Sequence, residues 1–220
     1  MYKKLFITSL VLLFCGISYA QERHDRWVWP DEHIEDAVFV QLGIGPKIGA
    51  GFGMASNPSF FDFNFNGGFT YQFGAAINFH IAHHPSLGMR GSDRVGLEIE
   101  ASYSQRNFKA DNKTLSMRCI EIPVLLQFYL TREWLVEAGV TPVKGLGVSP
   151  DNLQIADVVA NVGSIKGDDM MISAGAAYKT DFGLLVGLRY NLGTSKWAEN
   201  IQSKTHTAMV SVTYLLSVLK

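Results

Sequence analysis

The sequence predicts an all-β fold, an eight-stranded antiparallel up-and-down transmembrane β-barrel. Eight segments alternate apolar and polar residues, which is typical of strands with one apolar and one polar face. These segments exceed the about five or six residues usual in soluble sheets, and they suit the roughly nine to eleven residues that a tilted strand needs to cross a bilayer. Aromatic residues gather near the predicted strand ends, as in membrane barrels: Tyr71, Tyr103, Phe128, Tyr129, Trp134, Tyr178, Tyr190 and Tyr214.

The composition limits the class of protein. Charged residues make up 18% of the 220 residues and hydrophobic residues 47%, with 21 glycines, which is a low-charge and glycine-rich balance for a soluble domain. The formal net charge of −1 argues against nucleic acid as a partner, because nucleic-acid binding needs a basic surface. Beyond the N-terminal segment no run of about 18 apolar residues occurs, so no transmembrane helix is expected.

Residues 1–20 predict a secretory signal peptide. Lys3 and Lys4 form a basic start, residues 5–17 form an apolar core, and residues 18–20 (Ser-Tyr-Ala) form a small-x-small cleavage site. We expect cleavage directly after this site and export from the cytoplasm. The exported chain then keeps a single cysteine, Cys119, so no intramolecular disulfide is available.

The rest of the chain divides into two parts. Residues 21–36 are predicted as a periplasmic N-terminal segment and residues 37–220 as the outer-membrane β-barrel domain. The segment is polar and charged, and Pro30 interrupts it. Trp27 and Trp29 lie close together there, which is compatible with an anchor at the membrane interface or with a flexible tail. Both interpretations stay open.

The first four predicted strands cover residues 38–53, 67–81, 94–108 and 114–130. The third strand alternates without a break, and its polar face carries Glu98 and Glu100 in the middle of the strand. In the fourth strand the apolar residues change from odd to even positions after Cys119. Such a change predicts a β-bulge, and Pro123 close by cannot donate a ladder hydrogen bond.

The last four predicted strands cover residues 134–141, 170–178, 183–192 and 204–216. Links after the fourth and sixth strands are short, and those after the first, fifth and seventh are longer, as for short periplasmic turns and longer external loops. The link after the second strand is longer than this pattern requires, and the link after the third is short. The longest link, Gly145 to Asp169, contains an apolar patch compatible with a short helix, formed by Leu153, Ile155, Val158 and Val159.

The polar faces of the predicted strands carry four basic and four acidic side chains. These charges would cancel in a narrow lumen through paired contacts, whereas a barrel facing water would carry far more Lys and Glu. Side chains just fill the lumen of an eight-stranded barrel, so we expect a plugged lumen with a structural charge network. Its predicted members are Lys47, Glu98, Glu100, Arg106, Arg118, Glu121, Glu137 and Arg189.

Catalysis is an alternative use of these carboxylates, and gating or ligand contact is another. Glu98 and Glu100 share a face about 7 Å apart, a spacing that general acid–base pairs can use, but no nucleophile motif such as GxSxG accompanies them. His80, His83 and His84 have no carboxylate or cysteine at ligand spacing in their segment. The sequence therefore predicts no catalytic residue, no metal site and no cofactor.

Five short motifs lie along the chain: Lys47–Gly49 (KIG), Ser102–Phe108 (SYSQRNF), Ile120–Tyr129 (IEIPVLLQFY), Val136–Gly139 (VEAG) and Leu188–Gly193 (LRYNLG). Together they resemble the PorT-like outer-membrane β-barrel proteins, a family of outer membrane protein beta-barrel domains. The similarity covers nearly the whole exported chain. It implies an eight-stranded barrel in the bacterial outer membrane.

Two positions depart from the family pattern. Such barrels commonly end in an aromatic residue that the assembly machinery reads, and this sequence ends in Ser217–Lys220 (SVLK). The signal would then lie further in, at Tyr214. Gln127 stands where the family often has Lys. The family takes its name from a member linked to protein secretion, and we do not transfer that role to this chain.

The expected function is that of a non-enzymatic integral protein of the bacterial outer membrane. Expected partners are outer-membrane lipid, the barrel-assembly machinery during biogenesis and, through the loops, other envelope proteins or secretion machinery. One alternative is a soluble periplasmic, lipocalin-like carrier of an apolar ligand, with the apolar face inward. Another is a membrane-barrel enzyme that acts on lipids. Alternation by itself does not decide which face lies inside.

Overall fold

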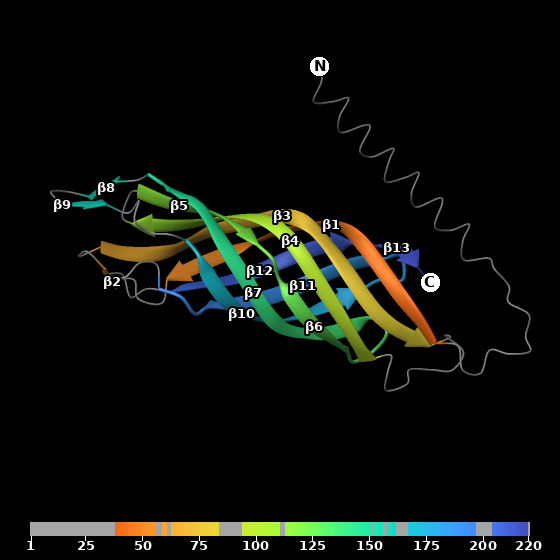
Figure 1. The fold of residues 1–220 in the computed structure, drawn as a ribbon. Coiled ribbons are helices and arrows are strands. Elements are labelled where there is room, and N and C mark those ends of the chain that lie inside the picture. Colours follow the sequence, from red (N-terminus) through yellow and green to blue (C-terminus); the bar gives the residue numbers. More distant parts are fainter. Residues whose placement is uncertain are drawn as a thin grey trace, which may run out of the picture. The chain divides into compact units, whose positions relative to one another are not determined.

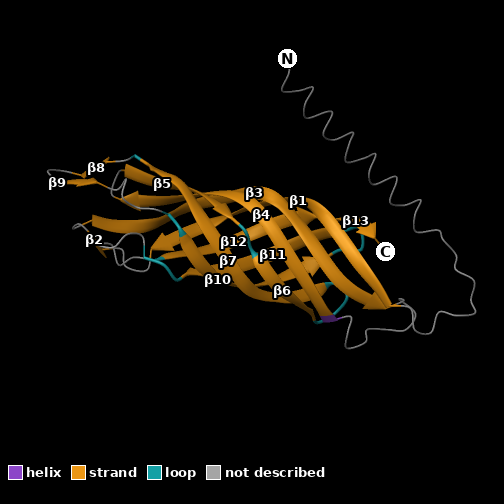
Figure 2. Cartoon of the chain, viewed as in Figure 1, coloured by secondary structure: helices purple, strands orange, loops and turns teal. Residues whose placement is uncertain are grey.

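The computed structural model describes residues 38–55, 59–60, 63–83, 94–110, 113–150, 152–155, 158–161, 167–196 and 204–219. Strands make up almost all of these residues (Figure 2). Within these ranges no helix is long and apolar enough to cross a membrane. The predicted signal peptide (residues 1–20) and the predicted N-terminal segment (residues 21–36) lie outside the described residues.

Eight antiparallel strands build the wall of a barrel (Figure 1). Two of them are interrupted and carry two labels each, β5 with β6 and β12 with β13. The wall strands are β1 (Val38–Ala55), β3 (Phe63–His83), β4 (Val95–Ala110), β5 (Lys113–Glu121) with β6 (Val124–Tyr129), β7 (Trp134–Ser149), β10 (Asp169–Lys179), β11 (Leu184–Gly193), and β12 (Thr205–Tyr214) with β13 (Leu216–Leu219). Three short strands lie outside the wall: β2 (Ser59–Phe60), β8 (Asn152–Ile155) and β9 (Val158–Asn161).

Pairing between the first and last strands closes the barrel. Lys47 on β1 pairs with Gly74 on β3 on one side and with Thr213 on β12 on the other. Between these two strands each neighbour pairs with the next in chain order. The predicted all-β, eight-stranded antiparallel up-and-down barrel is therefore confirmed.

We call the end with the turns at residues 130–133 and 180–183 the turn end, and the opposite end the loop end. β1 begins at the turn end, where Val38 pairs with His83, and β13 lies there too, since Leu219 pairs with Leu42. At the loop end β4 meets β5, and the long link between β7 and β10 begins.

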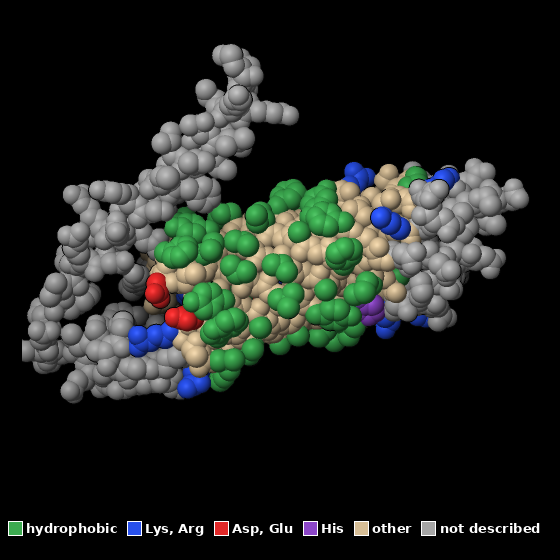
Figure 3. Space-filling view, turned by 180° about the vertical axis from the view of Figure 1, so that it is seen from behind, with side chains coloured by type: hydrophobic (Ala, Val, Ile, Leu, Met, Phe, Trp, Pro, Cys, Tyr) green, Lys and Arg blue, Asp and Glu red, His purple; other side chains and the backbone are tan. Residues whose placement is uncertain are grey.

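The apolar face of every wall strand points outward. Ile48 on β1 is 63% exposed and Leu188 on β11 is 61% exposed, although both lie in the middle of long strands. Figure 3 shows hydrophobic side chains spread along the middle of the barrel, with the charged side chains at its two ends. At the turn end the rings of Trp134 and Tyr178 contact each other edge to face, with 5.1 Å between their centroids.

The inward face is polar in its middle and apolar near both ends. A turn-end cluster contains Tyr129, Leu135, Ala177 and Leu185, all buried. A loop-end cluster contains Cys119, Val143 and Met171, and Phe108, Leu115 and Met117 are also fully buried. Tyr129 therefore faces the lumen, whereas Trp134 at the same end is exposed.

The predicted bulge lies in a different strand. Leu115, Met117 and Cys119 point inward, and so does Glu121, so the alternation of side-chain direction continues through β5 without a shift. Pro123 does interrupt the strand, because it ends β5 before β6 begins. The register shift lies on β7, where Arg118 pairs with Gly147 but Cys119 pairs with Gly145.

The extra residue on β7 is thus Leu146, which is exposed. The apolar residues move from odd to even positions because the odd ones, up to Cys119, fill the lumen at the loop end, whereas the even ones, from Ile120 on, face outward. The side-chain alternation of the strand itself does not change. The prediction of a phase change after Cys119 is wrong for this reason.

The apolar patch between Gly145 and Asp169 does not form the short helix with which its sequence is compatible. β7 continues to Ser149, and the apolar patch forms β8 and β9, an antiparallel pair in which Ile155 faces Val158. Ile and Val are β-branched and favour strands over helices.

Candidate functional site

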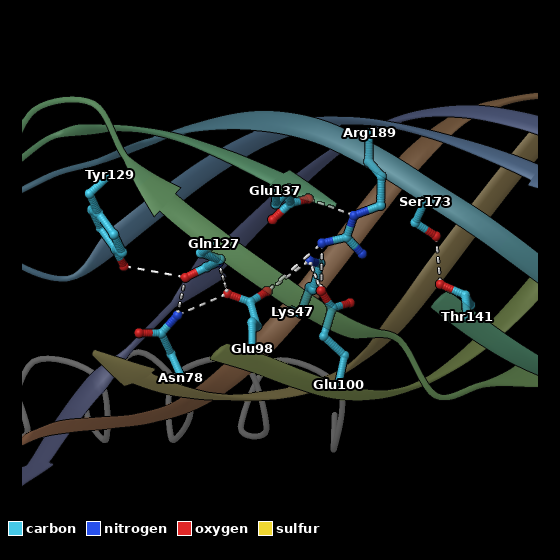
Figure 4. Close-up of polar contacts among 10 residues, drawn as sticks. All are labelled: Lys47, Asn78, Glu98, Glu100, Gln127, Tyr129, Glu137, Thr141, Ser173 and Arg189. Carbon is cyan, nitrogen blue, oxygen red and sulfur yellow. Dashed lines mark hydrogen bonds and ion pairs between the residues drawn. The ribbon is translucent and has the colours of Figure 1, made fainter. Parts of the chain in front are cut away.

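Charged side chains from four strands meet in the middle of the lumen (Figure 4). Lys47 Nζ lies 2.7 Å from Glu100 Oε1, and Arg189 Nη2 lies 2.6 Å from the same oxygen. The Nε of Arg189 donates to Glu137 Oε1 at 2.6 Å. These residues come from β1, β4, β11 and β7, which are alternate strands of the eight-stranded ring. The network therefore joins strands that do not pair with each other.

Local sequence explains why these charges lie inside. Each one is flanked in the chain by outward-facing residues, as Lys47 is by Pro46 and Ile48. Since side chains alternate, an apolar outer face forces the intervening charges into the lumen. There the carboxylates are shielded from solvent, with Glu98 0% and Glu100 1% exposed. Buried charges of this kind persist only when partners compensate them.

Glu98 connects the ion pairs to a set of amide side chains. Its Oε2 accepts hydrogen bonds from Gln127 Nε2 at 2.8 Å and from Asn78 Nδ2 at 3.2 Å. Its Oε1 lies 3.5 Å from Lys47 Nζ and 3.9 Å from Arg189 Nη2. Tyr129 donates its hydroxyl to Gln127 Oε1 at 3.3 Å and so connects this set to the turn-end cluster.

A second ion pair lies nearer the loop end. Arg106 Nη2 is 2.6 Å from Glu121 Oε1, and both residues are buried. Ser104 donates its hydroxyl to the same carboxylate oxygen. The guanidinium also lies 3.5 Å from the sulfur of Met171, so it touches the loop-end cluster directly.

Arg118 does not belong to this network. The alternation of β5 places it on the outer face, where it is exposed. The other seven predicted members are buried and point inward: Lys47, Glu98, Glu100, Arg106, Glu121, Glu137 and Arg189. Without Arg118, the predicted members comprise three cations and four carboxylates, and Lys179 on β10, which the prediction missed, lies with its Nζ 5.7 Å from the centre of the Tyr129 ring in the lumen.

Several lumen residues were missed by a search that considered only charges. Asn78 and Gln127 complete the contacts of Glu98. Thr141 and Ser173 bond through their hydroxyls at 2.7 Å, and Asn191 donates to Thr207 at 2.9 Å. Their signal in the sequence is the same as that of the charges, a polar residue at an inward position between outward apolar ones.

The chemistry available to these carboxylates is limited by their surroundings. Glu98 and Glu100 lie among amides and cations and have almost no solvent exposure. In the described part of the chain, no three His, Cys, Asp or Glu residues are arranged to hold a metal ion. His80 stacks on Tyr129, with 4.0 Å between ring centroids. Within the described residues the arrangement is a set of buried ion pairs and hydrogen bonds that crosses the lumen.

Comparison with known proteins does not assign this chain to a family. No family model matches the chain, and no curated protein matches it. Among solved structures it is similar to Neisserial surface protein A, with 10% identity and a TM-score of 0.45 over 81% of this chain and 99% of that one. Ail, the attachment invasion locus protein of Yersinia pestis, matches with 11% identity and a TM-score of 0.40 over 82% of this chain and 99% of that one. Similarities this low do not show kinship.

The fold assignment therefore rests on the closed ring of strands. Apolar side chains cover its outside, and the described inward side chains bury a network of ion pairs and hydrogen bonds. The chain is an eight-stranded antiparallel β-barrel with an apolar outer face and a charged lumen.

Proposed function

We propose that this chain is a non-enzymatic integral protein of a bacterial outer membrane, with a plugged lumen and a loop end that recognises a partner. The observation that carries the proposal is the direction of the two faces. Charges lie inside and large apolar side chains lie outside, which is the reverse of a soluble protein and is typical of a transmembrane barrel. A lipocalin-like carrier needs an apolar lining around its ligand, and the buried ion pairs occupy that position.

The height of the apolar band fits a bilayer. Along β5, β6 and the residue after them, every second side chain from Ile120 to Leu130 is apolar and exposed. At about 3.4 Å per residue this stretch is about 34 Å long. A strand tilt of about 45° reduces its height to about 24 Å, close to the about 25 Å of apolar surface on outer-membrane barrels.

The filled lumen supports a structural role over a channel. Layers of buried side chains follow each other from Tyr129 at the turn end, through the ion pairs, to Phe108 at the loop end. Eight-stranded barrels have lumens that side chains just fill. The network is therefore assigned to holding the barrel closed.

The loop end supports a recognition role. β10 begins at Asp169, opposite Val143, whereas β7 continues to Ser149 with β5 along one side. The other edge of residues 144–149 has no strand partner among the described residues, apart from a bond from Gly145 N to Asp168. An open strand edge can pair with an added strand from another envelope protein. The proposal also includes that the chain is a PorT-like barrel, the family that its sequence motifs resemble.

The test is fractionation followed by heat-modifiable gel migration. The full chain should sediment with outer membranes, require detergent for extraction, and migrate differently before and after boiling in SDS. A protein that stays soluble without detergent and shows no shift would contradict the proposal. Reconstitution into vesicles and protection of the wall strands from protease give an independent check.

A further inference from the structure

The outer face of the barrel changes character on β4, β5 and β7 near the loop end. Polar and basic side chains continue the outward alternation there, directly beyond the apolar band. We call this surface the outer polar strip and define it as Gln105, Asn107, Lys109, Ser116, Arg118 and Lys144. Gln105 pairs with Arg118, Asn107 pairs with Ser116, and Lys144 pairs with Ile120, the last apolar residue of the band on β5.

Side-chain hydrogen bonds hold the uncharged part of the strip. Tyr71 donates its hydroxyl to Gln105 Oε1 at 2.8 Å, and Gln105 Nε2 donates to Asn107 Oδ1 at 3.2 Å. Ser116 donates to the same Asn107 oxygen at 2.7 Å, and Asn107 Nδ2 donates to the carbonyl of Phe69 at 2.7 Å. An outward polar ladder of this kind would be costly inside hydrocarbon, so it marks the level at which the lipid headgroups begin.

The charges of the strip are basic, and they have few acidic partners among the described residues. Lys144 forms an exposed ion pair with Asp168, with Nζ and Oδ2 2.7 Å apart. No carboxylate of the described residues pairs with Arg118 or Lys109. Arg118 lies beside its strand partner Gly147, where an added Cβ would be 3.5 Å from the Nη2 of Arg118.

We propose that the outer polar strip binds the anionic phosphate groups of the lipids in the leaflet at the loop end. The proposal rests on the membrane-spanning function proposed above and adds a lipid class to it. Arg118 supplies a planar donor that matches phosphate oxygens bidentately. Lys109 adds a second charge within the reach of the same headgroup layer, and the hydrogen-bonded amides supply neutral donors beside it.

The experiment measures lipid selectivity with spin-labelled lipids. The full chain is reconstituted into dimyristoylphosphatidylcholine vesicles that contain a trace of spin-labelled phosphatidic acid or of spin-labelled phosphatidylcholine. The fraction of motionally restricted label gives the relative association of each lipid with the barrel. We expect phosphatidic acid to be preferred, and Arg118→Gln to reduce the preference by about fivefold, the factor typical of one basic side chain at a membrane surface.

Lys196→Gln is the matched control. Lys196 is exposed at the same end but follows β11, on the opposite side of the ring from β4 and β5. This variant removes the same charge and should leave the preference unchanged, whereas Arg118→Gln combined with Lys109→Gln should abolish it. Equal loss in the control and in Arg118→Gln would overturn the inference, because it would show a response to net charge alone.

The same experiment separates this inference from the proposed function. A barrel that spans the membrane restricts some spin-labelled phosphatidylcholine whatever the headgroup preference. If both labels are restricted equally, the strip does not select anionic lipid, and the membrane barrel stands. If neither label is restricted, the membrane-spanning function itself is wrong.

Discussion

Lys47 on β1 and Glu100 on β4 form an ion pair of 2.7 Å, although β3 lies between their two strands in the sheet. The contact crosses the lumen instead of following the wall. Glu100 also accepts a hydrogen bond from Arg189 on β11, so one carboxylate connects three strands that share no backbone pairing. Stability of the barrel should therefore depend on this carboxylate more than on any exposed charge.

Replacing Glu100→Gln should lower the free energy of unfolding by about 3–5 kcal/mol, because it removes the buried carboxylate that both Lys47 and Arg189 contact and weakens the compensation of both buried cations. The measurement is urea-dependent unfolding in detergent micelles. Glu133→Gln is the control, since Glu133 is exposed in the turn between β6 and β7, and it should change stability by less than about 0.5 kcal/mol. Equal effects of the two variants would show that the network is not structural.

Substitutions of Arg106 and Arg118 test which of these two side chains faces the lumen and which faces outward. Arg106→Gln removes the buried partner of Glu121 and should cost about 3–5 kcal/mol, whereas Arg118→Gln changes an exposed side chain and should cost less than about 0.5 kcal/mol. Both are measured by unfolding in zwitterionic detergent, where no anionic lipid is present. A large cost for Arg118→Gln would place that side chain in the lumen and contradict the position of the bulge on β7.

The apolar band predicts that the cost of placing a charge on the outer face depends on the depth of that position in the bilayer. Leu126 lies within the band and is exposed, so Leu126→Arg should cost about 2–4 kcal/mol in phospholipid vesicles, the range for a lipid-facing arginine near the bilayer midplane. Leu130 lies at the edge of the band, and Leu130→Arg should cost about 0–1 kcal/mol. In a soluble protein neither exposed position would resist a charge, so two small values would contradict the membrane barrel.

Close packing of the β1 and β12 backbones predicts that Gly51 cannot be replaced by a larger residue without loss of stability. A Cβ added there would lie 2.0 Å from the carbonyl oxygen of Ala208 on β12 and 2.7 Å from the Cα of Met209. Gly51→Val should therefore disturb the seam between β1 and β12, with a loss of about 1–3 kcal/mol or more. Ala50→Val points outward and should be tolerated. The folded fraction in a heat-modifiable gel shift reports both variants, and equal folding would contradict the tight seam.

The plugged lumen that we propose predicts an absence of ion conduction. The full chain in a planar lipid bilayer should give no stable conductance steps, since a buried apolar cluster lies at each end of the polar layer. Tyr129→Ala removes the largest side chain of the turn-end cluster and should raise the leak current. Regular steps from the unmodified protein would show that the lumen opens, and the network would then be a gate.

Much of the fold could be predicted because alternation is a local property. The eight predicted strands correspond to the eight wall strands, and the inward positions of seven of the eight predicted lumen charges follow from period-two geometry alone. Arg118 failed this reasoning, since the apolar residues around Cys119 were taken as the outer face. Apolar side chains fill the lumen near the loop end, and a rule that equates apolar with outward misreads them.

The sequence by itself determined the strands, their number and the two kinds of face, because each depends only on neighbouring residues. The charges collected on the polar faces also predicted which face lies inside. Only the tertiary structure decided which charges meet and where the extra residue of the bulge lies. Lys47 and Glu100 are 53 positions apart, and Arg189 and Glu100 are 89 positions apart. Their contacts depend on strand register and on closure of the ring, which no single stretch of sequence contains.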